Sequence, residues 1–270
     1  MNLEQTRDKW VSKNNNSKAA IAMWDSQAQS QCYHQIPSFD NNQFLMLMES
    51  KGMLNQSYDV LDIGCGAGVY SIAIADRVRT VTGVDISPKM IEYGKNKALE
   101  LNLDNVNLFQ ADWKGLSLED DGYDSHFDLV FAHMTPAVSC ALTLEKMNAA
   151  SKHYCILCKP TRRNDPVYFE VERLMGIENT GSTFDETIIN TFSMLWQLGY
   201  SPEIAYENQV WNTNRTYEEA CQFYISRAKQ IKVLNDSDID KAKDYLKSIE
   251  KNGRISECIN TVITTISWEK

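Results

Sequence analysis

The side chains best suited to bind a nucleotide-like ligand lie in one short stretch, residues 60–68. It reads Val-Leu-Asp-Ile-Gly-Cys-Gly-Ala-Gly, so an apolar run containing Asp62 is followed by Gly64, Gly66 and Gly68. The apolar run predicts a buried parallel strand, and the glycines predict a tight loop whose backbone can approach a ligand closely. The residues that follow have helical spacing, and the first N–H groups of a helix can bind polar or anionic groups. The stretch therefore predicts a strand, a ligand-binding loop and a helix.

The spacing of these glycines separates them from the dinucleotide-binding fingerprint. That fingerprint is G-x-G-x-x-G, whereas this loop reads G-x-G-x-G and has Val69 where the third glycine would stand. No residue elsewhere is an evident acid for hydride transfer. An NAD-dependent enzyme is therefore disfavoured.

Two further acidic positions follow the next predicted strands. Asp85 ends the run Thr80–Asp85, and Asp112-Trp113 directly follows the run Val106–Ala111. The carboxyl ends of parallel strands meet at one edge of a sheet, where ligands bind. A carboxylate at the end of the second strand can accept hydrogen bonds from both hydroxyls of a ribose.

Taken together, these residues resemble the motifs of class I S-adenosylmethionine-dependent methyltransferases of the small-molecule, Rossmann-like type. The resemblance covers about residues 55–160, one βα-repeat region, and implies S-adenosylmethionine as methyl donor and S-adenosylhomocysteine as product. It implies that Asp62 orients the loop or the cofactor's ammonium and that Asp85 binds the ribose. The cofactor-binding positions that it implies are Asp62, Gly64, Cys65, Gly66, Gly68, Asp85, Ile86, Asp112, Trp113 and Ala132.

Within this resemblance, the adenine has three neighbours. Asp112 would accept from its amino group, whereas Trp113 and Ile86 would lie against the ring. For Asp112 and Trp113 the alternatives are a surface carboxylate and an ordinary core tryptophan. The position of both residues at a strand end favours the cofactor.

The predicted strand Phe127–Ala132 leads into a loop that would face the donor methyl group. The loop begins at His133 and lacks three signatures. These are the Pro-Pro-aromatic motif of DNA and glutamine methyltransferases, the Pro-Cys of cytosine C5 enzymes, and the paired glutamates of arginine methyltransferases. A small-molecule acceptor is therefore expected. His133 is a candidate general base, although it would equally position the cofactor or cap a helix.

Three residues are predicted to contact the acceptor: Tyr33, His133 and Arg162. Arg162 and Arg163 follow the fifth predicted strand and would hold a carboxylate or phosphate, unless they are simply solvated loop charges. Tyr33 and Trp24 resemble an N-terminal segment that folds over the cofactor, and core anchoring is the alternative.

Cys155-x-x-Cys158 invites a metal or redox interpretation. The pair lies on the predicted strand His153–Lys159, where residues three apart face opposite sides. Two such thiols cannot easily chelate one ion, so both are expected to be structural and no metal site is predicted.

The alternation of strands and helices predicts an α/β fold with a doubly wound, mostly parallel seven-stranded sheet. By the resemblance, the last strand is antiparallel. We expect one domain with an N-terminal helical lid (1–52), a cofactor-binding core (53–160) and a C-terminal part (161–270). Expected strands are Val60–Ile63, Thr80–Asp85, Val106–Ala111, Phe127–Ala132, His153–Lys159, Glu203–Trp211 and Cys258–Trp268. Helices expected at 217–233 and 237–249, inserted before the last strand, would cap the substrate side or form the surface of a homodimer.

Composition narrows the class of protein further. The 270 residues are 43% apolar, which suffices for a full core, and the net charge of −9 argues against a broad nucleic-acid interface. The seven cysteines do not suggest a disulfide framework. Without an evident signal peptide or membrane span, a cytoplasmic location and no membrane partner are expected. An RNA or protein methyltransferase, and a protein that binds the cofactor without methyl transfer, remain alternatives.

Overall fold

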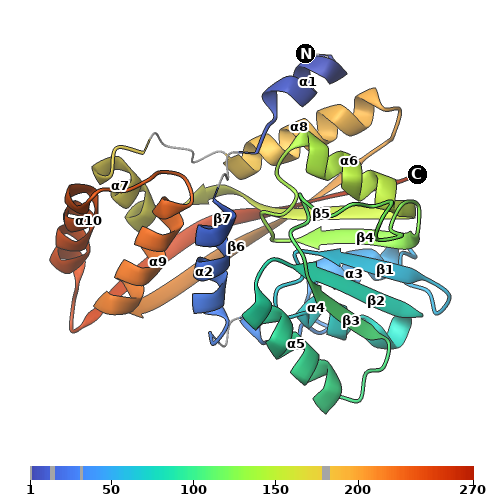
Figure 1. Ribbon diagram of the computed structural model, residues 1–270, viewed down its shortest axis with the longest axis horizontal. Helices are drawn as coiled ribbons and strands as arrows, with labels where there is room; N and C mark the ends of the chain where they lie inside the picture. The colour runs from blue at the N-terminus through green and yellow to red at the C-terminus, as the bar shows by residue number, and fades with distance from the viewer. Residues whose placement is uncertain (1, 13–15, 31–32, 178–182) are drawn as a thin grey trace.

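A computed structural model describes residues 2–12, 16–30, 33–177 and 183–270. Its centre is one seven-stranded sheet of order β3-β2-β1-β4-β5-β7-β6 (Figure 1). Strands β1 to β5 are parallel, and β7 is antiparallel to both β5 and β6. The strands are β1 (Asp59–Ile63), β2 (Thr80–Asp85), β3 (Val106–Gln110), β4 (Phe127–His133), β5 (Ser151–Asn164), β6 (Glu203–Thr216) and β7 (Arg254–Glu269). The predicted fold class and the antiparallel last strand are confirmed.

The central strands are buried on both faces, as their continuous apolar runs predict. Every residue of β1 is buried. Within the sheet, Asp62 of β1 lies beside Gly83 of β2 and Phe131 of β4. The carboxyl ends of the three strands therefore meet at one edge, from which the loops that follow them converge.

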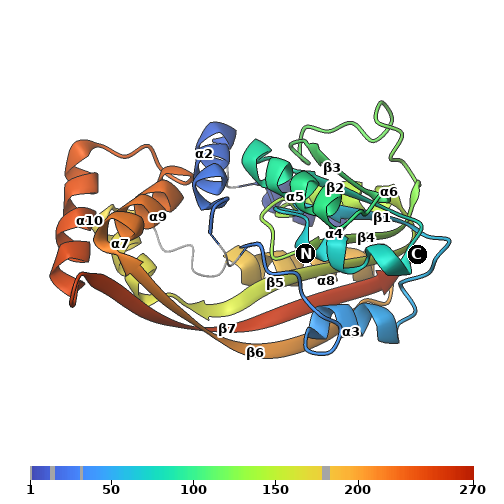
Figure 2. The ribbon, with the colours of Figure 1, turned by 90° about the horizontal axis from the view of Figure 1, so that it is seen from below.

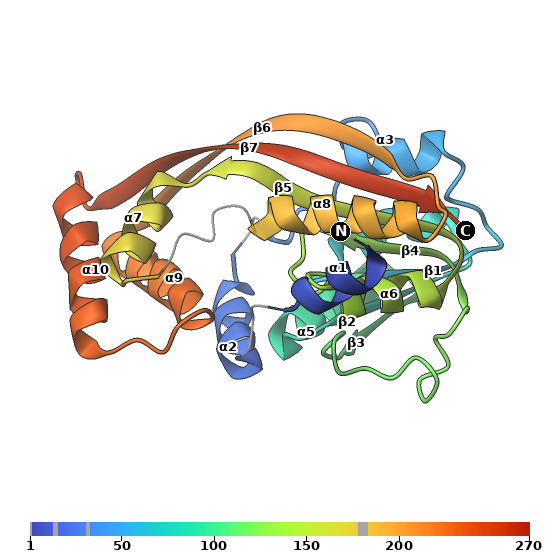
Figure 3. The same ribbon diagram turned by 90° about the horizontal axis from the view of Figure 1, so that it is seen from above.

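Helices cover both faces of the sheet. One buried cluster lies under α1, α6 and α8, which Figure 3 shows on one side of the sheet; a second lies under α3 and α4. The helices are α1 (Leu3–Lys9), α2 (Ser17–Gln27), α3 (Gln43–Ser50), α4 (Val69–Ala73), the 3₁₀ turn η2 (Ala75–Arg77), α5 (Pro88–Glu100), α6 (Ala141–Ala150), α7 (Pro166–Leu174), α8 (Thr183–Gln197), α9 (Tyr217–Lys229) and α10 (Asp236–Ile249).

Strands β5, β6 and β7 continue well past the core and carry a separate group of helices (Figure 2). We call α7, α9 and α10 the cap; they bury a third apolar cluster of their own. The predicted end of the fifth strand at Lys159 is wrong, because β5 continues to Asn164. Burial alternates along β6: its odd-numbered residues from Ala205 to Thr213 are half-buried, although most are polar, and the residues between them are exposed.

Helix α2 lies between the core and the cap in the views of Figures 1 and 2. Its Met23 is buried and accepts a hydrogen bond at Sδ from Gln230, just after α9 (2.8 Å). The N-terminal part of the chain thus contacts both parts of the molecule. No helix in the described part of the chain is both long enough and apolar enough to cross a membrane.

Candidate functional site

A cavity of about 710 Å³ lies at the carboxyl ends of the strands. Its walls come from the glycine loop (Gly64–Gly68), the ends of β2, β3 and β4, helix α2 and the segment 33–42. Cavities of this size are typical of small-molecule sites. The predicted residues that line it are Tyr33, Gly64, Cys65, Gly66, Asp85, Ile86, Asp112, Trp113 and His133.

The glycine loop needs glycine at its first two glycine positions for different reasons. Gly64 (φ +68°) packs so tightly that an added Cβ would lie 2.0 Å from the Thr135 hydroxyl oxygen. Gly66 (φ +56°) lines the cavity, and an added Cβ would meet nothing within 4 Å. The first glycine thus permits a close contact between loops, and the second leaves the cavity open to a ligand.

Asp85 presents its carboxylate to the cavity at the end of β2. Its Oδ2 accepts from the Gly66 N–H (2.9 Å) and its Oδ1 from the Ser87 N–H (2.8 Å). Burial raises the pKa of this carboxyl, and the two N–H groups oppose that effect. Both oxygens are therefore held in a fixed orientation, as binding two ribose hydroxyls requires.

Asp112 and Trp113 form the next part of the wall. The Trp113 indole is buried and donates from Nε1 to the Thr143 carbonyl (3.1 Å), which fixes the plane of its ring. Asp112 Oδ1 accepts from the Lys114 N–H (3.1 Å), so the carboxylate has a defined direction. Both side chains therefore hold defined positions in the cavity wall.

Three predicted cofactor positions lie behind the cavity wall and do not line it. Asp62 is 2% exposed and accepts a hydrogen bond at Oδ2 from the Ser71 hydroxyl (2.7 Å), so it joins the end of β1 to α4. Gly68 is the N-cap of α4, and Ala132 is fully buried in β4. Burial raises the pKa of Asp62 to about 7. In this structure the Asp62 carboxylate contacts α4, and its predicted role in orienting the loop stays a prediction.

His133 lies in a ring cluster at the end of β4. Its ring is 4.0 Å from that of Tyr70 and 4.6 Å from that of Phe44, between centroids. Burial lowers the pKa of His133 to about 3. An imidazole with so low a pKa is a weak base at neutral pH, so its environment favours shaping the cavity over removing a proton.

The loop after His133 is held by a buried lysine. Lys159 on β5 is fully buried and its ammonium donates to the Thr135 carbonyl. The Thr135 hydroxyl accepts from the Ala137 N–H (3.2 Å), and its side chain packs on Gly64. Sequence reasoning missed Lys159 and Thr135, because nothing in the local sequence indicates that they meet.

Helix α2 spans the cofactor side of the cavity. Near its start, the Ser17 hydroxyl lies 3.5 Å from Asp112 Oδ2; near its end, Asp25 Oδ1 accepts from the Ser87 hydroxyl (2.6 Å). Trp24 and Tyr33 both line the cavity, with their rings edge to face at 6.0 Å. Helix α2 and Tyr33 thus form part of the cavity wall, and their role as a lid over a bound cofactor stays a prediction.

Arg162 lies away from this site. It occupies the irregular end of β5 with φ +46°, its side chain is exposed, and its backbone N–H donates to Asp185 (2.8 Å). The structure does not bring it to the cavity with the other predicted substrate residues, because β5 continues outward instead of ending in a loop. Arg163 is instead paired with Asp165 (2.6 Å) at the base of the cap.

The two cysteines of the Cys-x-x-Cys motif pack on opposite faces of the sheet. Cys155 belongs to the cluster under α6 and α8, and Cys158 to the cluster under α3. Among the described residues, no group of three or more His, Cys, Asp or Glu side chains is arranged to hold a metal ion. The interpretation of both thiols as structural is supported.

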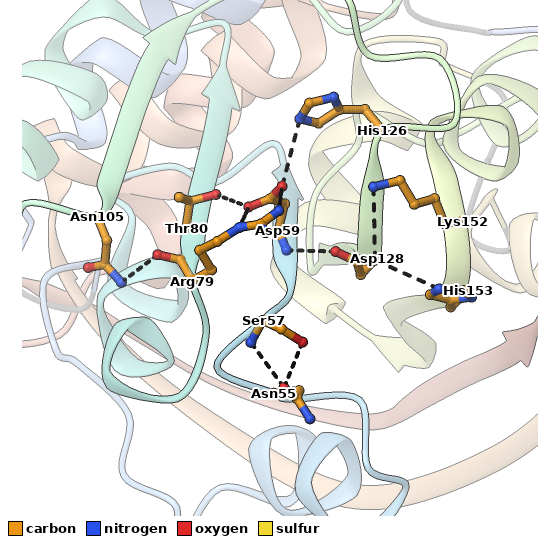
Figure 4. Close-up of polar contacts among 10 residues, drawn as sticks. All are labelled: Asn55, Ser57, Asp59, Arg79, Thr80, Asn105, His126, Asp128, Lys152 and His153. Atoms are coloured by element: carbon orange, nitrogen blue, oxygen red, sulfur yellow. Dashed lines mark hydrogen bonds and ion pairs between the residues drawn. The ribbon is translucent and has the colours of Figure 1, made fainter.

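A separate charged cluster lies at the amino ends of β1, β2 and β4 (Figure 4). Asp59 accepts from Arg79 Nε (2.8 Å) and from the Thr80 hydroxyl (2.7 Å), and the Asp59 N–H donates to Asp128 (2.8 Å). The Arg79 guanidinium lowers the pKa of Asp59. This cluster joins strand ends at the edge opposite the cavity, so its role is structural.

The fold and the site together define a Rossmann-like methyltransferase. The family model described as "Methyltransferase domain" matches residues 54–253, and the chain belongs to this family. YcgJ of Bacillus subtilis, an uncharacterized methyltransferase, is 25% identical over 241 residues, covering 87% of this chain and 94% of YcgJ. The family implies S-adenosylmethionine as the methyl donor.

Solved structures agree on the fold. That of YcgJ aligns with a TM-score of 0.51 at 21% identity, covering 83% of this chain and 97% of YcgJ. A methyltransferase structure from Bacillus halodurans aligns with a TM-score of 0.53 at 14% identity, covering 85% of this chain and 99% of that one. At these identities the comparison concerns the fold alone.

Proposed function

We propose that this methyltransferase transfers the methyl group of S-adenosylmethionine to a small-molecule acceptor and releases S-adenosylhomocysteine. The observation that carries the proposal is the convergence of Asp85, Asp112 and the open face of Gly66 on one cavity. The two carboxylates, as hydrogen-bond acceptors, suit a ribose and an adenine amino group, and the open face of Gly66 suits an extended amino-acid chain. When bound, the cofactor supplies a methyl group on a positively charged sulfur.

The residues contribute mainly by orientation. Asp85 is held by two backbone N–H groups, Trp113 is fixed through its indole nitrogen, and α2 covers the bound ligand. Holding two reactants in line removes much of the entropic barrier to their reaction. The net charge of −9 supports an acceptor other than a nucleic acid, and we also propose that the protein works in the cytoplasm.

The test is cofactor binding to an Asp85→Ala variant. A hydrogen bond to a charged group contributes about 1.5–3 kcal/mol, and Asp85 is expected to form two with the ribose, so we expect binding at least about 100-fold weaker. Isothermal titration calorimetry with S-adenosylmethionine and S-adenosylhomocysteine measures it. Asp76→Ala, at an exposed aspartate on η2, is the matched control and should bind normally. A wild-type protein that binds neither compound would refute the proposal.

A further inference from the structure

The cavity has two halves that differ in charge. Among its described lining residues, the carboxylates and ammonium groups belong to Asp85, Asp112 and Lys114. All three lie at the ends of β2 and β3, where the adenosine would bind. We call one uncharged part of the remaining wall the acceptor half; it consists of the segment 35–42, Tyr70, His133 and the start of the following loop. Burial keeps His133 neutral by lowering its pKa to about 3, so this half carries no formal charge.

In the acceptor half, the hydrogen bond between Asn42 and Tyr70 leaves the hydroxyl proton of Tyr70 available for a ligand. Asn42 is the N-cap of α3, and its Oδ1 accepts from the Leu45 N–H (3.1 Å). This contact fixes the side-chain amide, so its Nδ2 is the atom that donates to the Tyr70 oxygen (3.0 Å). Because the phenol oxygen is the acceptor in this bond, its own proton remains to be donated elsewhere.

Tyr70 keeps that proton under ordinary conditions. Burial raises its pKa to about 12. Glu207 on β6 contributes to the rise through its negative charge, although it is not among the lining residues and its carboxylate accepts from Gln209 (2.7 Å). At neutral pH the hydroxyl of Tyr70 is therefore a hydrogen-bond donor.

The surroundings of this donor favour a flat, apolar ligand. The rings of Tyr70 and His133 both line the cavity and lie 4.0 Å apart. Phe44 supports both rings from behind, at 5.6 and 4.6 Å. The side chains of Ile36 and Pro37 add apolar surface to the same half. Aromatic and apolar walls of this kind bind ring systems well.

We propose that the acceptor is an uncharged ring compound bearing a hydroxyl group, and that Tyr70 recognises this hydroxyl while Asn42 holds Tyr70 in position. The inference rests on the proposed methyl transfer. A carboxylate, phosphate or ammonium group in the acceptor half would lose its hydration without an oppositely charged lining side chain to pair with, which is unfavourable. A neutral hydroxyl avoids this cost and gains the hydrogen bond from Tyr70.

The fate of the hydroxyl proton indicates that the hydroxyl group of the acceptor is an acidic one. Methylation forms a bond between the acceptor oxygen and the methyl carbon and breaks the carbon–sulfur bond of the sulfonium, whose electron pair stays on sulfur. The hydroxyl proton must then leave to water. Because His133 is a weak base, a phenol or enol, which loses its proton far more easily than an alcohol, suits this site.

The test uses the protein saturated with S-adenosylhomocysteine and matched ligands on benzene, naphthalene and quinoline rings. Each ring carries a hydroxyl, a carboxylate or an aminomethyl group. We expect hydroxyl members to raise the melting temperature and to bind in calorimetry, and the two charged members to do neither. Tyr70→Phe should weaken the binding of the hydroxyl compounds about tenfold and leave S-adenosylhomocysteine affinity unchanged. Tyr58→Phe, at the opposite edge of the sheet, is the matched control and should change neither.

Three outcomes would overturn the inference. They are tighter binding of a carboxylate or ammonium member, no binding of any hydroxyl member, and a Tyr70→Phe protein that binds the hydroxyl compounds as the wild type does. In each case, retained binding of S-adenosylhomocysteine shows that the cofactor site is intact and that only the acceptor assignment has failed. Loss of S-adenosylhomocysteine binding by the wild-type protein would instead count against the proposed function.

Discussion

At the residue scale, two aspartates that both follow apolar runs have different roles. Asp85 faces the cavity with both oxygens held by N–H groups, whereas Asp62 is buried beneath the glycine loop and bound to Ser71. Desolvation raises the pKa of Asp62 to about 7, well above its value of 3.8 in an unfolded chain. Folding therefore binds a proton at Asp62 between these two pH values.

This proton uptake gives Asp62 a measurable effect on stability. Its contribution is fully present below pH 3.8 and is lost as the pH rises towards 7, because the unfolded chain then releases a proton that the folded protein retains. We expect Asp62→Asn to remove a slope of up to about 1.4 kcal/mol per pH unit from the free energy of unfolding in this range. Urea unfolding at several pH values measures the slope. The same slope in the Asp62→Asn variant and in the wild type would contradict the raised pKa of Asp62.

At the element scale, the site depends on contact between loops that follow different strands. The glycine loop after β1 packs against Thr135 in the loop after β4, and Lys159 of β5 binds the carbonyl of that threonine. Three neighbouring strands thus determine the shape of the wall that would face the methyl group.

Two alanine substitutions in the glycine loop should separate the destabilisation caused by close packing from that caused by backbone strain. Gly66→Ala places its Cβ in open space and should cost only the positive-φ strain, about 1–2 kcal/mol. Gly64→Ala has a similar φ and also collides with Thr135, which adds about 1–3 kcal/mol. Urea denaturation of both variants measures the difference. Equal destabilisation would show that the contact with Thr135 contributes nothing.

At the scale of the whole molecule, a buried charge network attaches the cap to the extended strands. Asp165, between β5 and α7, is 1% exposed and pairs with Arg163 (2.6 Å) and with Arg227 of α9 (2.8 Å). Glu257 of β7 accepts from the Tyr224 hydroxyl (2.6 Å) and from the Val167 N–H (2.8 Å). Strands and cap helices are therefore linked by charged groups.

Removing the central charge of this network should be costly. Asp165→Asn removes the carboxylate that contacts both partly buried guanidinium groups directly, and we expect a loss of about 3–5 kcal/mol in the free energy of unfolding. Asp240→Asn, at an exposed position of α10, removes the same charge and should change stability by less than about 0.5 kcal/mol. Chemical denaturation compares the two. Similar values for both would mean that the cap is held by its apolar cluster alone.

Much of the fold and the cofactor half of the site follow from local sequence. The run before Asp62, the glycine spacing, and the positions of Asp85 and Asp112 predicted the strands, the loop and the edge at which they meet, and the structure places these residues together. Extended strand ends were harder to predict. The polar residues of β6 resemble a loop until their partners on β7 are known.

The acceptor half was the least predictable part of the site. Tyr70, Asn42, Thr135 and Lys159 come from separate elements, and no local pattern indicates that they meet. Arg162 is a residue that was predicted at the site and does not lie there. Its position after the predicted end of a strand suggested a ligand contact, whereas β5 continues past it and its N–H binds Asp185 away from the cavity.

The sequence by itself thus determined the family, the sheet and the Asp85 and Asp112 side of the cavity, because these depend on apolar periodicity and on short motifs at strand ends. The tertiary structure decided which half of the cavity carries charge, which tyrosine hydroxyl accepts a hydrogen bond from Asn42, and how the cap is attached. These properties depend on contacts between residues far apart in the chain. Burial and neighbouring groups, which set the pKa of Asp62 and His133, exist only once those contacts have formed.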